Sequence, residues 1–190
     1  MPTYGMICYC LAFSSQQIPL PMVYWLVACI GTFVITAFIP LTLILFFKRR
    51  GAISDFSISK AQERTQIYWF TILCYAFWIY FTFKIIHTPF VAMVGIWATI
   101  ALVLVTLINY RWKISAHLTG LGGLLGGILA YTYNYAQPLP IITITILLVV
   151  ALLLMYARLY LNAHTPGQVV AGFLLGIIMT VGPVYLSLYA

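Results

Sequence analysis

Six long stretches without Asp, Glu, Lys or Arg dominate this sequence and decide what it can fold into. Each is about as long as the ~20 apolar residues that a helix needs to cross a bilayer. The chain is 64% hydrophobic and only 6% charged, which excludes an ordinary soluble domain. The sequence therefore predicts an all-α fold, a polytopic transmembrane bundle of six helices in which residues 22–190 form one domain. The six stretches are Met22–Phe47, Ile67–Phe83, Phe90–Asn109, Ser115–Tyr133, Ile141–Ala157 and Val169–Leu188.

The first 21 residues stand apart from these runs. Met1–Phe13 is apolar but too short to span a bilayer, and it contains Pro2 and Gly5. We expect residues 1–21 to form a short apolar stub that lies at the membrane interface or re-enters the bilayer. The alternative is that the stub is the remainder of a trimmed first helix.

The charged residues are few and of one sign. Nine Lys and Arg stand against two acids, Asp55 and Glu63, which fall in one polar segment. Two acids and three His can hardly supply the ligands of a two-metal hydrolase, and an intramembrane aspartyl protease needs two Asp. A net charge of +7 suits an anionic substrate or an anionic lipid surface. We expect no metal, no other cofactor and no nucleic acid partner.

The polar residues form three clusters along the chain, separated by apolar runs. Each interval between clusters holds two expected spans, so the chain crosses the membrane and returns. All three clusters then lie at the same membrane face, together with every Lys and Arg except Lys84. Such a face favours recognition of an oxyanion, and phosphate suits the planar fork of Arg and the free N–H groups of helix N-termini. The clusters are Lys60/Glu63/Arg64, Arg111/Lys113/Ser115/His117 and Arg158/Asn162/His164/Gln168.

Two histidines stand at expected helix starts in this set. His117 lies at the start of the fourth span, and His164 precedes the sixth, which has Pro166 in its first turn. A nucleophile and a general acid are the minimum for breaking a phosphoester, and two His can fill both roles. A hydrolase built on Ser115 and His117 is disfavoured, because side chains two positions apart on a helix do not face each other.

Two segments resemble the signatures of the type 2 phosphatidic acid phosphatase family of membrane-embedded lipid phosphatases. Arg158–Gly172 resembles the third signature, Ser-Arg-x5-His-x3-Asp, and matches its spacing at Arg158, His164 and the final position, Gln168. Ile114–His117 resembles the second signature, Pro-Ser-Gly-His. The first signature, Lys-x6-Arg-Pro, is matched only weakly, by Lys60–Arg64. The chain thus resembles a divergent member of that family.

The resemblance implies a role for each matching residue. His164 would attack phosphorus and form a phosphohistidine, and His117 would be the general acid. Arg158, Arg64 and Ser115 would hold the phosphate, with Lys60 or Lys113 supplying the cation that the first signature lacks. Gln168 replaces the Asp that orients the nucleophilic His; its amide oxygen would accept the Nδ1–H bond but stabilise an imidazolium less. Members of this family need no metal.

These observations lead to one hypothesis and two alternatives. We expect an integral, multi-pass protein of the bacterial inner membrane that removes phosphate from a phospholipid or polyprenyl phosphate or diphosphate. The alternatives are a family-like scaffold that binds anionic lipid without turnover, or a small transporter. The excess of cations places the cluster face in the cytoplasm by the positive-inside rule, whereas the family resemblance favours the periplasm, so the orientation stays open.

Overall fold

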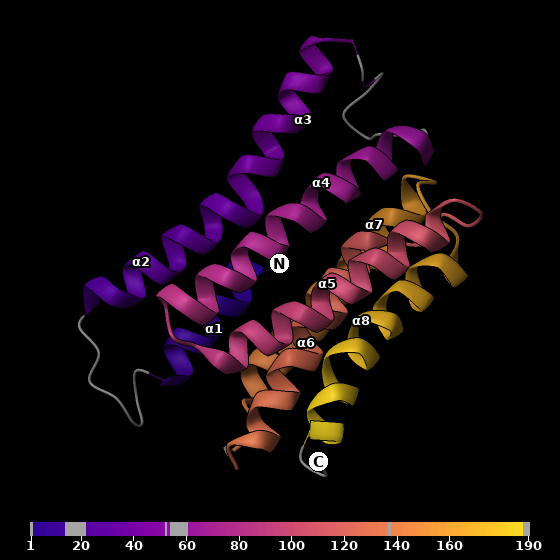
Figure 1. The fold of residues 1–190 in the computed structure, drawn as a ribbon. Helices are drawn as coiled ribbons and strands as arrows, with labels where there is room; N and C mark the ends of the chain where they lie inside the picture. The colour runs from indigo at the N-terminus through magenta and orange to yellow at the C-terminus, as the bar shows by residue number, and fades with distance from the viewer. Residues whose placement is uncertain (1, 14–21, 52, 54–60, 137, 188–190) are drawn as a thin grey trace. The chain divides into compact units, whose positions relative to one another are not determined.

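The computed structural model describes residues 2–13, 22–51, 53, 61–136 and 138–187. Within these ranges the chain is helical and contains no strand, which confirms the all-α prediction. The described residues form seven continuous helices rather than six, because the apolar stub is itself helical, as α1 (Pro2–Phe13). Residues 1 and 14–21 of the expected stub lie outside the described residues. Figure 1 gives the order of the helices along the chain.

Among the described residues, four helices are long and apolar enough to cross a membrane. They correspond to the first, second, third and fifth expected spans. The fourth expected span is the glycine-rich α6 (Ala116–Asn134), and the sixth is α8 (Pro166–Ser187), whose Pro166–Gly182 part is a shorter apolar helix. The four candidate spans are Met22–Arg49, Glu63–Ile85, Pro89–Asn109 and Ile141–Tyr160.

The chain divides into two compact units, Pro2–Thr99 and Ile100–Ala190, which we describe separately. The first unit contains α1, α2 (Met22–Phe33), α3 (Ile39–Arg49), α4 (Ala61–Tyr80) and the beginning of α5 (Pro89–Asn109). Its buried centre includes a hydrogen bond from Trp78 Nε1 to Thr32 Oγ1 of 3.0 Å, which links α4 to α2 and satisfies both polar atoms. Cys10 and Cys29 also meet there, with their sulfur atoms 3.7 Å apart.

Two π-helical turns interrupt the long helices of the first unit. Val34–Phe38 joins α2 to α3, and Ile39 N–H donates to the Val34 carbonyl, five residues back. Pro40 follows directly and accounts for the wider turn, since its ring lacks an N–H and would collide with the carbonyl four residues before it. A second π turn, Phe81–Ile85, ends α4 and leads into the turn at His87.

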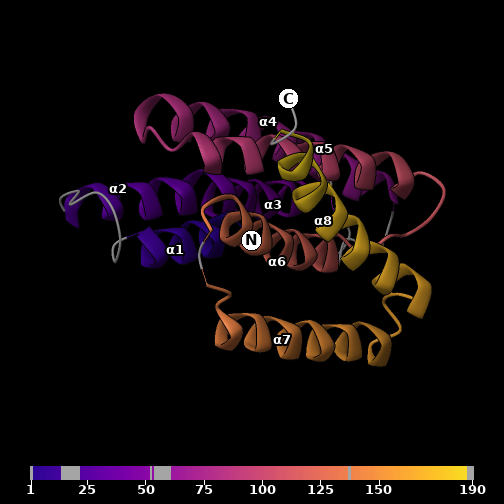
Figure 2. The ribbon, with the colours of Figure 1, turned by 90° about the horizontal axis from the view of Figure 1, so that it is seen from below.

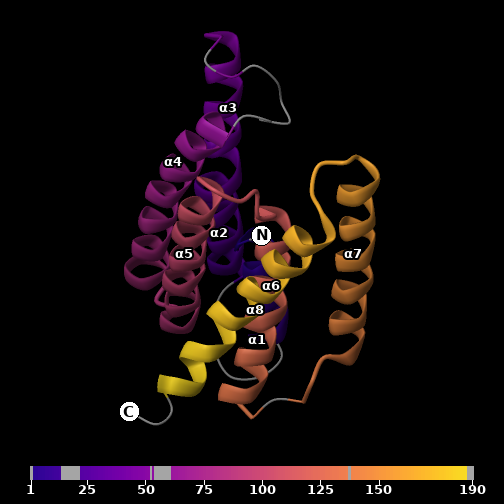
Figure 3. The same ribbon diagram turned by 90° about the vertical axis from the view of Figure 1, so that its right-hand side faces the viewer.

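The second unit contains the end of α5, α6, α7 (Ile141–Tyr160) and α8. Figures 2 and 3 show α8 crossing α6, with α7 lying beside this pair. Only Ala151 of α7 is buried, so that this helix exposes a long apolar surface, as a lipid-facing helix does.

Glycines allow the backbones of α6 and α8 to touch. A Cβ at Gly172 would lie 2.6 Å from the Ser115 carbonyl oxygen, and one at Gly176 would collide with the Thr119 carbonyl and lie 2.6 Å from Gly123 N. On the other side, a Cβ at Gly122 would collide with the Phe173 carbonyl. This small-residue packing brings the first turns of the two helices together.

We predict that Gly176→Ala destabilises the protein by about 1–3 kcal/mol, because its methyl group meets backbone atoms that cannot rotate away. Gly123→Ala is the matched control: its Cβ would meet only Thr180 Cγ2 at 3.7 Å and the Gly176 carbonyl at 3.8 Å. Thermal unfolding in detergent should show a lower Tm for Gly176→Ala and an equal or higher Tm for the control. Equal losses in both variants would contradict this account of the α6–α8 contact.

Candidate active site

The C-terminal end of α7 fixes the spacing between Arg158 and His164. Asn162 adopts a left-handed conformation, with φ 50°. Its N–H donates to the Leu159 carbonyl at 2.9 Å, and Ala163 N–H donates to the Arg158 carbonyl at 3.0 Å. These two bonds form a Schellman motif, which closes the helix and reverses the chain. The carbonyl of Arg158 also accepts the His164 N–H at 3.4 Å, so that the backbones of the two residues are joined directly.

The start of α8 is capped by its own residues. The Thr165 carbonyl accepts the N–H groups of Gln168 at 3.0 Å and of Val169 at 3.2 Å, which marks Thr165 as the N-cap. Gln168 Oε1 in turn accepts the Thr165 N–H at 3.1 Å. This is the return bond of a capping box, for which the Thr-x-x-Gln pattern is a recognised sequence signature.

The start of α6 has no such cap. Ser115 occupies the N-cap position in an extended conformation, but its side chain makes no capping hydrogen bond. The residue is fully buried, and its Oγ has no hydrogen-bond partner among the described residues. The N–H groups of the first turn of α6 therefore point out of the helix without a side-chain acceptor.

Two hydrogen bonds tie these helix starts together. The Ser115 N–H donates to the Gln168 carbonyl at 3.2 Å, and His164 Nδ1 lies 3.0 Å from the Lys113 carbonyl oxygen. The segment before α6 and the segment before α8 thus run side by side. Lys113, Ser115, His164 and Gln168, all expected from the sequence as site residues, are brought together here.

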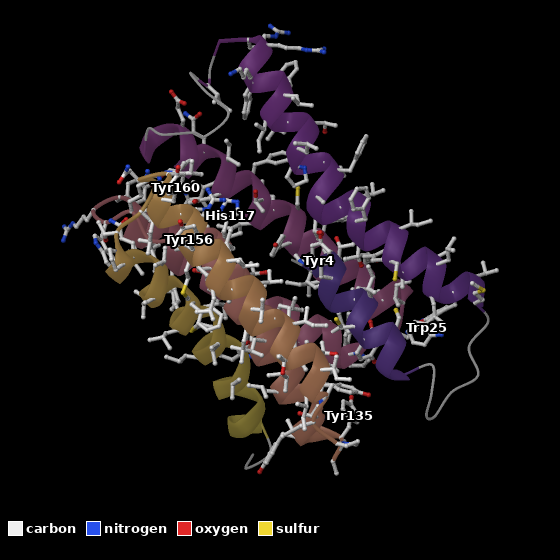
Figure 4. All side chains as sticks on the ribbon, turned by 180° about the vertical axis from the view of Figure 1, so that it is seen from behind. Tyr4, Trp25, His117, Tyr135, Tyr156 and Tyr160 are labelled. Carbon is white, nitrogen blue, oxygen red and sulfur yellow. The ribbon has the colours of Figure 1, made fainter. Side chains whose placement is uncertain are left out.

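His117 and Arg158 belong to the same group of side chains. The positive charges of Arg158 and His164 act on the His117 ring, so that the three side chains lie near one another. Figure 4 shows His117 near the end of α7 that carries Tyr156 and Tyr160. His117 is exposed, whereas Arg158 and His164 are half-buried. Two imidazoles, a guanidinium and an ammonium therefore gather at paired positive helix ends, an arrangement suited to binding and transferring a phosphoryl group.

The surroundings of His164 favour its neutral form. Burial is the largest cause and lowers the pKa of its imidazole; the positive charges of Lys113 and Arg158 lower it further. The hydrogen bond to the Lys113 carbonyl and a weaker hydrogen bond with the Gln168 side chain oppose this shift and raise the pKa. Because a neutral imidazole keeps one nitrogen lone pair free, these charges preserve a nucleophile near neutral pH.

Two of the expected phosphate ligands do not belong to the unit that contains this group. Arg64 is in the first turn of α4, in the Pro2–Thr99 unit, and its Nε is buried without a hydrogen-bond partner among the described residues. Lys60 lies outside the described residues. Both remain predictions from the sequence. In the part of the chain that the structure describes, no three His, Cys, Asp or Glu side chains form a group suited to a metal ion.

Comparison with known families agrees with the motifs. Residues 109–189 match the family model of the PAP2 superfamily, in agreement with the resemblance of the second and third signatures to the type 2 phosphatidic acid phosphatases. The matched segment contains His117, Arg158 and His164 but neither Lys60 nor Arg64. No curated protein and no solved structure matches the chain.

Sequence reasoning missed three contributors to this geometry. The Thr165–Gln168 capping box and the left-handed Asn162 each carry a local signal, since Thr-x-x-Gln precedes an apolar run and Asn ends a helix. The Lys113 carbonyl carries none, because any residue at that position presents the same oxygen. Gln168 Oε1 also accepts the Thr165 N–H, and the stronger hydrogen-bonding influence on the His164 ring comes from the Lys113 carbonyl.

We predict that Asn162→Val destabilises the protein by about 1–2 kcal/mol, because a β-branched residue resists the left-handed conformation. Asn162→Gly should be neutral or stabilising, since glycine is the commonest residue at this position of the Schellman motif. Thermal unfolding of the two variants against the wild type measures the difference. Equal stability of the Val and Gly variants would show that the motif is not formed.

We predict that His164 titrates below 6.5, the ordinary value of a histidine, and that Lys113→Gln raises its pKa. Removing the ammonium removes a charge that opposes protonation, so the protonated form should persist to higher pH. An NMR titration of the imidazole in 15N-histidine-labelled protein measures both values, with His164→Ala identifying the signal. A midpoint at or above 6.5 in the wild type would contradict the burial of the ring.

Proposed function

We propose that this protein is a membrane-embedded lipid phosphatase that works through a phosphohistidine on His164. The observation that carries the proposal is the gathering of His164, His117 and Arg158 at the paired starts of α6 and α8, within the segment that matches the PAP2 superfamily. The superfamily consists generally of phosphatases. A half-buried, neutral imidazole beside cations has the properties of an activated nucleophile for an anionic substrate.

The phosphate would be held both by cationic side chains and by neutral hydrogen-bond donors. Arg158 and Lys113 supply positive charge, and the first turn of α6 supplies N–H donors that no side chain caps. The Ser115 hydroxyl, buried and without a partner among the described residues, supplies a further donor. Burying a hydroxyl without a hydrogen-bond partner costs free energy, and a phosphate oxygen offers this hydroxyl an acceptor.

The proposed reaction has two steps. In the first, His164 Nε2 attacks phosphorus, a P–N bond forms and the P–O bond to the lipid breaks while His117 gives its proton to the leaving alkoxide. In the second, water attacks the phosphohistidine, His117 accepts a proton from that water, and the P–N bond breaks to release inorganic phosphate. His117 thus acts first as acid and then as base, and no metal takes part.

We further propose that all six expected spans lie in the bilayer. Four helices of the described part of the chain have the length and composition to cross a membrane. The helices α6 and α8 would complete the set as inner helices, because their glycine faces pack on each other and need less apolar side-chain surface. The substrate would be a phospholipid phosphate or a polyprenyl phosphate that reaches the site from the lipid phase. The protein would then reside in a bacterial inner membrane.

The proposal is tested by measuring phosphate release from a panel of lipid phosphates by the purified protein in detergent. His164→Ala should abolish release, lowering kcat by about 10⁴-fold or more, and His117→Ala should lower it by about 10²–10⁴-fold. After a rapid quench, wild-type protein should carry a base-stable, acid-labile phosphoryl group on His164.

His87→Asn is the matched control for loss of an imidazole. His87 is exposed in the turn before α5 with φ 51°, a conformation that Asn tolerates, so this variant should retain full activity. Release that persists in His164→Ala would overturn the mechanism. Absence of release from every lipid phosphate would favour a scaffold or a transporter that binds anionic lipid without turnover.

A further inference from the structure

We propose that the backbone carbonyl of Lys113, and not the side chain of Gln168, holds the Nδ1–H of His164 and presents its Nε2 for attack. This inference rests on the proposed function and concerns the orientation of its nucleophile. Lys113 is then a positioning residue through its main chain, and Gln168 is a helix-capping residue.

The identity of the acceptor determines the tautomer. His164 Nδ1 lies 3.0 Å from the Lys113 carbonyl oxygen, within ordinary hydrogen-bond distance. A carbonyl oxygen can only accept, so that this bond exists only when Nδ1 carries the proton. The lone pair of the neutral ring then resides on Nε2. The backbone therefore selects the form of the ring in which Nε2 is the nucleophile.

The carbonyl is itself held in place on both sides. Ile114 N–H donates to the Trp112 carbonyl at 2.8 Å, which closes a tight turn around Lys113. Directly after that turn, Ser115 N–H donates to the Gln168 carbonyl at 3.2 Å. The close approach of Gly172 to the Ser115 carbonyl fixes the same point from α8. The orientation of the Lys113 oxygen therefore depends on backbone contacts between the two helix starts.

Gln168 has another task in this arrangement. Its Oε1, the atom that would have to accept from His164, receives the Thr165 N–H at 3.1 Å. The amide NH2 group can only donate, so that a bond from it to Nδ1 would select the opposite tautomer, Nε2–H. The Gln168 side chain keeps a hydrogen-bonding influence on the ring that is weaker than that of the Lys113 carbonyl.

A neutral acceptor has an electrostatic consequence. A carboxylate in this place would stabilise the imidazolium form of the ring, whereas a carbonyl stabilises it much less. Among the described residues of the Ile100–Ala190 unit, the charged and titratable groups that act on His164 are Lys113, Arg158 on α7 and His117 on α6, and these three are not acids. The ring therefore stays neutral and nucleophilic to lower pH than it would beside a carboxylate.

The first test uses Gln168→Met, which keeps the length of the side chain and removes its hydrogen-bonding atoms. The probe is the pair of 15N shifts of His164 in 15N-histidine-labelled protein above its pKa, where Nδ1 should be of the protonated type and Nε2 of the unprotonated type. We expect this pattern in both wild type and variant, with a lower Tm in the variant because α8 loses its cap.

The outcomes of this test separate the two proposals. A shift to the Nε2–H pattern or to a mixture in Gln168→Met would overturn the present one and return the orienting role to the Gln168 amide. The 15N pattern does not depend on turnover. If no lipid phosphate is hydrolysed while the pattern persists in the variant, the proposed function fails and the assignment of the acceptor stands.

The second test weakens the carbonyl itself. Incorporating the α-hydroxy acid analogue of Ile at position 114 turns the Lys113–Ile114 peptide into an ester, whose carbonyl is a poorer acceptor. It also removes the Ile114 N–H bond of 2.8 Å. The matched control is the analogue of Trp at position 112, which loses an N–H bond to the Ile108 carbonyl of the same 2.8 Å length but leaves the Lys113 carbonyl intact.

We expect the ester at 114 to add the Nε2–H tautomer to the 15N pattern and to lower kcat by about tenfold, with the control unchanged in both. An unchanged 15N pattern in the 114 ester would overturn the proposal. So would equal changes in the 114 ester and the 112 control, because these would reflect the lost N–H bond alone.

Discussion

The backbone contact between α6 and α8 is the constraint on which the candidate site depends. Gly172 and Gly176 let the carbonyls of Ser115 and Thr119 approach the facing helix to distances that any side chain would prevent. The first turns of both helices are thereby placed side by side, and His117 and His164 come with them. The glycine-rich segment of this chain is therefore both a packing surface and the reason that two positive helix ends can face one anion.

Much of this arrangement could be predicted from the sequence because it depends on local rules. Uncharged runs such as Phe90–Asn109 predicted helices directly, and α5 has nearly the same bounds. The interval between Arg158 and His164 is the product of a single Schellman motif, so that a short sequence pattern carries it. The number of candidate membrane spans was harder to predict, because the small residues that let α6 pack closely also lower its hydropathy.

The parts that could not be predicted depend on contacts between distant segments. Nothing in Lys113 distinguishes its carbonyl from any other, and its approach to His164 is set by the α6–α8 packing. Gln168 was predicted as the orienting residue from its position in the third signature. The segment Thr165–Gln168 also has the pattern of a capping box. The placement of Arg64 with respect to the histidines is likewise a matter of tertiary structure, and it stays a prediction from the sequence.

The main-chain contact of His164 has a consequence for how this protein can vary. An acceptor that belongs to the peptide group is retained whatever amino acid occupies position 113, so substitution there can alter the ammonium charge while the geometry of the imidazole is preserved. A carboxylate partner would supply both the charge near the imidazole and its orientation. Here the Lys113 side chain supplies the charge and the Lys113 main chain supplies the orientation. Alanine scanning of the site would therefore detect the effect of the Lys113 ammonium but not that of the carbonyl that orients the imidazole, because alanine keeps the peptide group.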